Sequence, residues 1–173
     1  MTHRITKALL LGAALFASAG TAQASDTQSL LDSCITGESS NRAVMACTKL
    51  VRQTVDARVQ GELIATRAAH RVAMGNHKAA ARDFDHAAAL TDDRAMASLS
   101  DGFAAIGTRD LATAQARFED CGKRGDVAPM AAYGLGVTHD MAGRSAEARD
   151  SFQQALLLKP EWALAQERLR KLG

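Results

Sequence analysis

Residues 148–160 read ARDSFQQALLLKP, and two earlier stretches follow the same pattern, AARDFDHAAALTD at residues 80–92 and AQARFEDCGKRGD at residues 114–126. Each stretch starts 34 residues after the one before it and carries phenylalanine at its fifth position, with a small residue at its first and eighth positions. Self-similarity at this period is typical of stacked helical hairpins that bury one face against their neighbours. The sequence therefore predicts an all-α array with these positions in its core. The predicted core residues are Ala80, Phe84, Ala87, Ala114, Phe118, Cys121, Ala148, Phe152 and Ala155.

The last hairpin has the clearest boundaries. Its first helix is expected from Pro129 to His139, because proline is favoured in the first turn of a helix. Gly143 is a good left-handed C-cap for the turn, and Ser145 can cap the second helix through its side chain. The pair Lys159-Pro160 should end that second helix, since the residue before a proline disfavours the helical conformation.

The residues of this hairpin resemble a tetratricopeptide repeat: Leu135-Gly136 in the first helix, then Ala148, Phe152 and Ala155, and Pro160 after the second helix. The resemblance implies a right-handed α-solenoid of helix-turn-helix repeats, a class of array that binds proteins far more often than it does chemistry. Residues 59–173 are expected to hold three repeats and a C-terminal capping helix. Their expected ranges are about 61–92, 95–126 and 129–160, with the cap at 161–172.

Some positions depart from the family pattern. Arg67 and Asp101 stand where a large apolar residue is usual, and Arg109 stands in place of the turn glycine. Because Arg67 and Asp101 hold equivalent places in adjacent repeats, one hypothesis is that they pair across the helix interface. The alternative is that each charge is separately solvated.

The N-terminus has the features of a secretory signal peptide. Arg4 and Lys7 precede an apolar run at residues 8–17, and Ala22-Gln23-Ala24 is a small-x-small cleavage site. We expect residues 1–24 to be removed after Ala24 and the mature chain to be periplasmic or extracellular; the alternative is an uncut membrane anchor. Cleavage takes away two of the 21 basic residues and none of the 19 acidic ones, which leaves a net charge of zero. A neutral mature chain predicts no binding to nucleic acid or to a membrane surface.

Residues 25–58 are expected to form N-terminal helices before the repeats. An exported chain enters an oxidising space, so Cys34 and Cys47 are predicted to form a disulfide that joins a short first helix to a second helix starting near Asn41. That second helix resembles half of an incomplete repeat, and exported members of the family often carry a similar cysteine pair. Cys121 is interpreted as a buried free thiol. The alternative, a more specific one, is that it belongs to a Cys–His metal site.

The candidate partner-binding site is an apolar stripe on the first helices. In this family the first helices line the concave face, and Met96, Leu99, Phe103 and Ile106 step along one side of a helix by three, four and three residues. Methionines and aromatic rings suit an adaptable apolar ligand such as an amphipathic helix. Two alternatives remain: the stripe is core covered by the chain itself, or it is a homodimer contact. The predicted groove residues are Ala69, Val72, Met96, Leu99, Phe103, Ile106, Met130, Tyr133, Val137 and Met141.

No catalytic constellation is present in the sequence. A Gly-x-Ser-x-Gly elbow and a phosphate-binding glycine loop are both missing, and no cysteine pair has metal-ligand spacing. We therefore predict no enzyme activity, no cofactor and no metal. The expected function is a periplasmic adaptor that binds a protein or peptide, such as an envelope protein, through the apolar groove. The alternative is a self-associating structural protein whose groove is covered internally or in a homodimer.

Overall fold

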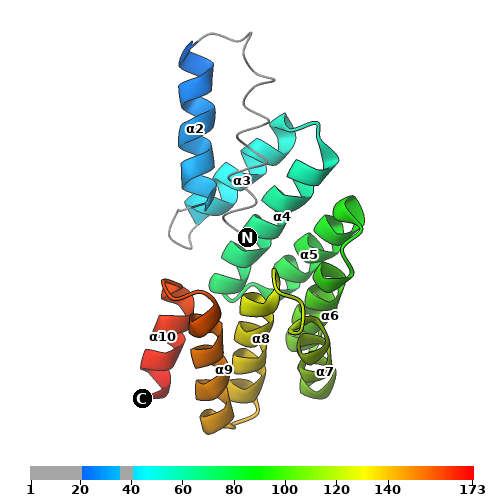
Figure 1. Ribbon diagram of the computed structural model, residues 1–173, viewed down its shortest axis with the longest axis vertical. Helices are drawn as coiled ribbons and strands as arrows, with labels where there is room; N and C mark the ends of the chain where they lie inside the picture. Colours follow the sequence, from blue (N-terminus) through cyan, green and yellow to red (C-terminus); the bar gives the residue numbers. More distant parts are fainter. Residues whose placement is uncertain (1–20, 36–40) are drawn as a thin grey trace.

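The computed structural model describes residues 21–35 and 41–173, and Figure 1 shows their arrangement. Within these ranges the chain forms α-helices and no strand. Most of the predicted signal peptide, residues 1–20, lies outside the described residues. None of the described helices is long and apolar enough to cross a bilayer.

In the part of the chain that the structure describes, two helices precede the hairpins: α2 (Thr21–Ile35) and α3 (Asn41–Gln53). Cys34 and Cys47 form the predicted disulfide between them, with their Cα atoms 4.9 Å apart. The helix α3 begins at Asn41, as expected. The helix α2 crosses the predicted cleavage point after Ala24, and cleavage there stays a prediction.

The disulfide is tied to the first repeat. A ring nitrogen of His70, Nε2, lies 2.7 Å from the main-chain oxygen of Cys34, and both residues are buried. Leu63 packs in the same small cluster as the two cysteines. The N-terminal helices are thereby joined to α4 by one buried hydrogen bond and a shared apolar core.

We expect the double variant Cys34→Ser, Cys47→Ser to unfold with a free energy lower by about 3 kcal/mol, because the disulfide closes a short loop in the unfolded chain. Urea denaturation monitored by circular dichroism measures this loss. A reducing agent should lower the stability of the natural chain to that of the double variant and leave the variant unchanged. Equal stability of the oxidised chain and the variant would contradict the prediction.

Three helical hairpins follow and stack in sequence order, from the cyan to the orange part of the chain in Figure 1. The pairs are α4 (Ala57–Ala73) with α5 (His77–Thr91), α6 (Arg94–Thr108) with α7 (Leu111–Cys121), and α8 (Ala128–Met141) with α9 (Ser145–Leu158). The last helix, α10 (Ala163–Leu172), packs against α9. Consecutive helix pairs packed in this way confirm the expected all-helical repeat array.

The second helices supply the core predicted from the 34-residue period. Phe84, Phe118 and Phe152 are at most 1% exposed, and the small residues four before and three after each are fully buried. A glycine on a neighbouring helix makes room for each of the last two rings. A Cβ atom added at Gly136 would lie 2.5 Å from the ring of Phe152.

The ring of Phe118 is held from two sides. A Cβ atom added at Gly102 on α6 would lie 2.6 Å from this ring, and one added at Gly134 on α8 would lie 2.5 Å from it. Such distances are far below van der Waals contact, so neither position accepts a larger residue without movement. Phe118 therefore joins the second hairpin to the third.

The hairpin turns use left-handed backbone at equivalent positions. Gly75 has φ 73°, Gly143 has φ 74°, and Arg109 has φ 61°. The expected left-handed conformation of Gly143 is confirmed, but the C-cap of α8 is the residue before it, Ala142. Ser145 is the first residue of α9 and not its cap, because Arg144 holds the N-cap position and no side-chain cap hydrogen bond forms there.

Arg109→Gly is expected to raise the free energy of unfolding by up to about 1 kcal/mol. Left-handed backbone costs a side-chain-bearing residue about 1–2 kcal/mol, and the greater freedom of glycine in the unfolded chain offsets part of the gain. Urea denaturation with an unchanged m-value checks this. The matched control, Thr108→Gly in the last turn of α6, should lower stability instead. A loss of stability in Arg109→Gly would contradict the prediction.

Candidate functional site

The structure places the predicted groove in the core. Ala69 and Met141 are half-buried, and the other eight predicted groove residues are at most 8% exposed. The expectation of an open apolar groove is wrong for these eight side chains, because neighbouring helices of the same chain cover them. The eight buried residues are Val72, Met96, Leu99, Phe103, Ile106, Met130, Tyr133 and Val137.

Phe103 is an example of a predicted groove residue of the second hairpin whose ring is covered by neighbouring helices. Its ring stacks on Phe84 at 5.6 Å and on His77 at 5.9 Å between ring centroids, both from α5. Phe118 from α7 meets it edge-on at 4.9 Å. Rings from two neighbouring helices thus surround Phe103, and such aromatic pairs add to its burial energy.

Tyr133 is the corresponding example in the third hairpin, where side chains of the same chain cover its ring. Its ring packs on Phe152 at 5.4 Å and on Trp162 at 5.2 Å, and Arg168 Nε donates a hydrogen bond of 3.1 Å to its hydroxyl oxygen. Burial raises the pKa of Tyr133. Arg168 is half-buried against Tyr133. Trp162 and Arg168 therefore cover Tyr133, which corresponds to the alternative in which the chain itself covers the stripe.

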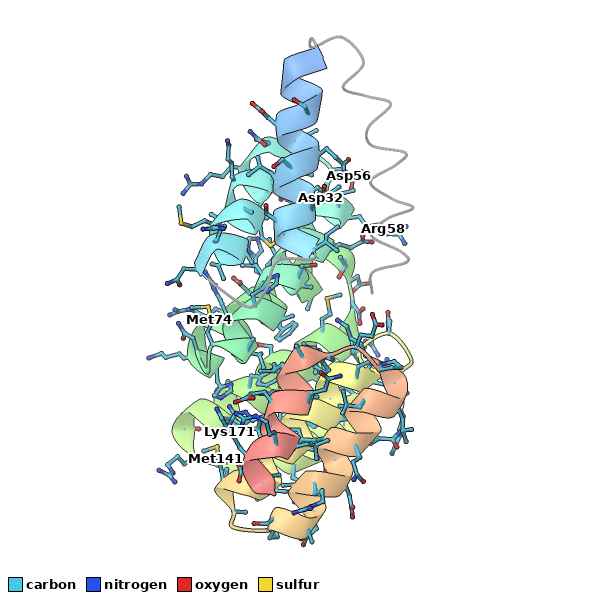
Figure 2. The ribbon with its side chains drawn as sticks, turned by 90° about the vertical axis from the view of Figure 1, so that its left-hand side faces the viewer. Asp32, Asp56, Arg58, Met74, Met141 and Lys171 are labelled. Atoms are coloured by element: carbon cyan, nitrogen blue, oxygen red, sulfur yellow. A yellow bond between two sulfur atoms is a disulfide. The ribbon has the colours of Figure 1, made fainter. Side chains whose placement is uncertain are left out.

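A polar hollow remains accessible at the edge of the array where successive hairpins begin. It is open to solvent, has a volume of about 570 Å³ and is bordered by the start of α4, the turn before α6 and the loop before α8. Arg58 projects from the N-terminal end of α4 with 76% of its side chain exposed (Figure 2). The lining residues are Arg58, Glu62, Ala65, Thr91, Asp92, Asp93, Arg94, Met96, Arg124 and Asp126.

Some of the charged side chains that line the hollow already have partners within the chain. Asp93 accepts hydrogen bonds from the main-chain nitrogens of Ala95 at 2.8 Å and Met96 at 3.3 Å, which caps α6. Arg58 lies 3.8 Å from Glu62. Within the described ranges, neither Arg94 nor Arg124 forms an ion pair, and both are exposed. Two guanidinium groups are thus available to bind carboxylates from another molecule.

Sequence reasoning missed this hollow, although a signal was present. Asp92 and Asp126 differ by 34 residues, and Arg58 stands 34 residues before Asp92. Residues one repeat apart lie on the same edge of a stacked array. The same spacing that identified the core could therefore have predicted a charged edge.

Arg67 does not pair with Asp101. It reaches Asp83 on α5 through two hydrogen bonds of 2.8 Å, and Arg71 Nη1 lies 2.7 Å from the same carboxylate. Asp101 instead faces Arg117 at 3.4 Å, with both side chains about half exposed. The cross-repeat pairing hypothesis is wrong because Asp83, in the same hairpin, is the partner of Arg67.

Two potentially reactive side chains of the described residues, Cys121 and Ser151, are held by local contacts. Cys121 is a buried free thiol, as expected, and burial raises its pKa to about 12, which keeps it from acting as a thiolate. Ser151 lies 3.2 Å from His139 Nδ1 but also donates a 2.8 Å hydrogen bond to the main-chain oxygen of Glu147. In the described part of the chain, no group of three or more His, Cys, Asp or Glu residues could hold a metal ion. The absence of an enzyme activity and of a cofactor stays a prediction.

Comparison with known proteins gives no relative: no family model, no curated protein and no solved structure matches this chain.

Proposed function

We propose that this protein is a non-enzymatic interaction module of the tetratricopeptide-repeat type, with a right-handed superhelix, and that it binds a polypeptide partner at the charged hollow. The observation that carries the proposal is the pair Arg94 and Arg124, two exposed guanidinium groups beside a hollow of about 570 Å³. The hollow replaces the apolar groove as the binding surface, because the groove side chains are core.

The two arginines of the hollow indicate what kind of partner it would bind. Arginine binds carboxylates through two parallel hydrogen bonds, so an acidic segment of a polypeptide fits Arg94 and Arg124. Asp92 is exposed beside them and adds selectivity by repelling a carboxylate that is out of register. The volume is within the range of sites that hold a few side chains of a ligand.

Site-specific photo-crosslinking in the native host tests the proposal. A photoreactive amino acid at Arg58, which lines the hollow and is not one of the two proposed binding residues, should give discrete crosslinked products, and these products should weaken when Arg124→Glu is added. The matched control places the same group at Arg82, an exposed arginine on α5 that does not line the hollow. Equal products from both positions, or none from Arg58, would contradict binding at the hollow.

The mass of the product separates the two candidate functions. A partner of unrelated mass supports an adaptor, and a product of twice the mass of the mature chain supports the self-associating alternative.

We also propose that the chain is exported to the periplasm or beyond after cleavage following Ala24. Support comes from the Cys34–Cys47 disulfide, since disulfides persist in oxidising compartments. N-terminal sequencing of the protein from fractionated cells tests this proposal. An intact Met1 in the cytoplasmic fraction would contradict it.

A further inference from the structure

We propose that the hollow recognises a polypeptide segment of mixed charge, in which a basic residue lies close to acidic ones, and that Asp92 is the residue that selects it. The proposal rests on the proposed function, binding of an acidic segment by Arg94 and Arg124, and adds a cationic group to that segment. Both signs of charge are then read at one site.

The lining of the hollow is not predominantly basic. It contains three arginines and four acidic residues: Arg58, Arg94 and Arg124 against Glu62, Asp92, Asp93 and Asp126. A segment with acidic side chains alone would be attracted by the arginines and repelled by the carboxylates. A segment that carries both signs of charge avoids this repulsion and gains attraction from both kinds of group.

Asp92 has a carboxylate that is available to a ligand. It is exposed, and in the described part of the chain it forms no ion pair. Its neighbour Asp93 differs, because it accepts hydrogen bonds from the first main-chain nitrogens of α6. Glu62 also differs, because it lies 3.8 Å from Arg58. Asp92 is therefore the acidic group to which a cation of the ligand would bind.

The helix ends at the hollow reinforce these charges. Asp92 is the C-cap residue of α5, and the C-terminal end of a helix carries a partial negative charge that attracts cations. Arg124 precedes α8, whose N-terminal end carries a partial positive charge. The N-cap residue of α8, Val127, forms no side-chain cap hydrogen bond. A cation is thus favoured beside Asp92 and a carboxylate beside Arg124.

The link from α5 to α6 fixes the backbone of this part of the hollow. It consists of two residues, since α5 ends at Thr91 and α6 begins at Arg94. Asp92 has left-handed backbone with φ 52°, and Asp93 caps α6. A backbone that is fixed before binding lowers the cost of ordering the complex.

Two buried apolar residues, Ala65 and Met96, also line the hollow. Long charged side chains pack their methylene groups along apolar surface while their charged ends reach polar groups. Glutamate, lysine and arginine have such methylene groups, so we expect them, rather than aspartate, in the bound segment.

Synthetic peptides test the proposal on the protein purified from its host. Three peptides of equal length are compared by fluorescence anisotropy at low ionic strength: one of alternating Glu and Lys, one with every Lys replaced by Gln, and one with every Glu replaced by Gln. The mixed peptide should bind about fivefold more tightly than the acidic one, the effect of one exposed ion pair. The basic peptide should bind most weakly, because Arg94 and Arg124 repel it.

Variants of the chain assign the preference to Asp92. In Asp92→Asn the advantage of the mixed peptide over the acidic one should disappear, and asparagine tolerates the left-handed backbone at this position. The matched control is Asp85→Asn, an exposed aspartate of α5 that does not line the hollow, and it should keep the advantage. Arg124→Glu should weaken the binding of the mixed and the acidic peptide alike.

The outcomes separate this proposal from the function on which it rests. Equal or tighter binding of the acidic peptide by the natural chain would overturn the mixed-charge segment and leave the acidic partner in place. A preference for the mixed peptide that survives in Asp92→Asn would overturn the role of Asp92. Binding of none of the three peptides, or binding that Arg124→Glu leaves unchanged, would contradict both this proposal and binding at the hollow.

Discussion

Phe118→Ala is expected to lower the free energy of unfolding by about 3–5 kcal/mol. The ring is fully buried and meets Phe103 edge-on at 4.9 Å. Removing it leaves a cavity that Gly102 and Gly134 cannot fill, because glycine has no side chain to move into the space. Both hairpins that meet at this ring lose contacts at once.

Urea denaturation at equilibrium measures the loss. The matched control is Glu119→Ala, the next residue on α7, which is exposed and should change stability by less than about 0.5 kcal/mol. A loss below about 1 kcal/mol for Phe118→Ala would mean that the second and third hairpins do not meet at this ring.

Asp83→Asn is expected to lower the free energy of unfolding by about 3 kcal/mol. The carboxylate is 4% exposed and neutralises Arg67 and Arg71, whose side chains are 13% and 25% exposed. An asparagine keeps the shape but leaves two largely buried guanidinium groups without a counter-charge. Arg67 also donates a 3.1 Å hydrogen bond to Thr48 on α3, so the loss should extend to the N-terminal helices.

Asp101→Asn is the matched control, since the same chemical change at an exposed ion pair should cost less than about 1 kcal/mol. Thermal denaturation of both variants, with the natural chain beside them, gives the comparison. Similar losses in the two variants would show that Asp83 is not the buried counter-charge of the first hairpin.

The sequence was sufficient to predict the second helices and their core. Ala148, Phe152 and Ala155 lie on one face because of helical geometry alone, and the repeated spacing shows that the same face is buried in every hairpin. The disulfide was predictable because Cys34 and Cys47 fall in two neighbouring helices. These features depend on local periodicity, which a sequence records directly.

The candidate site could not be predicted in the same way. Whether Phe103 and Tyr133 line an open surface depends on how α5, α7 and α10 pack around them, and side-chain periodicity gives only the apolar face. The partner of Arg67 was missed for a related reason. The position of Arg67 in its repeat suggested Asp101 as its partner. The packing of α4 on α5 in the same hairpin instead brings Asp83, 16 residues away in the sequence, within hydrogen-bond distance of Arg67.

The pH at which Tyr133 ionises tests the central claim that the apolar stripe on the first helices of the hairpins is closed core. As the one tyrosine of the chain, it can be titrated by its ultraviolet absorbance without ambiguity. We predict that it ionises at a pH clearly above 10.0, the ordinary value, because burial raises its pKa. Ionisation near pH 10, reversible and with native circular dichroism, would show that Tyr133 is open to water and would contradict this account.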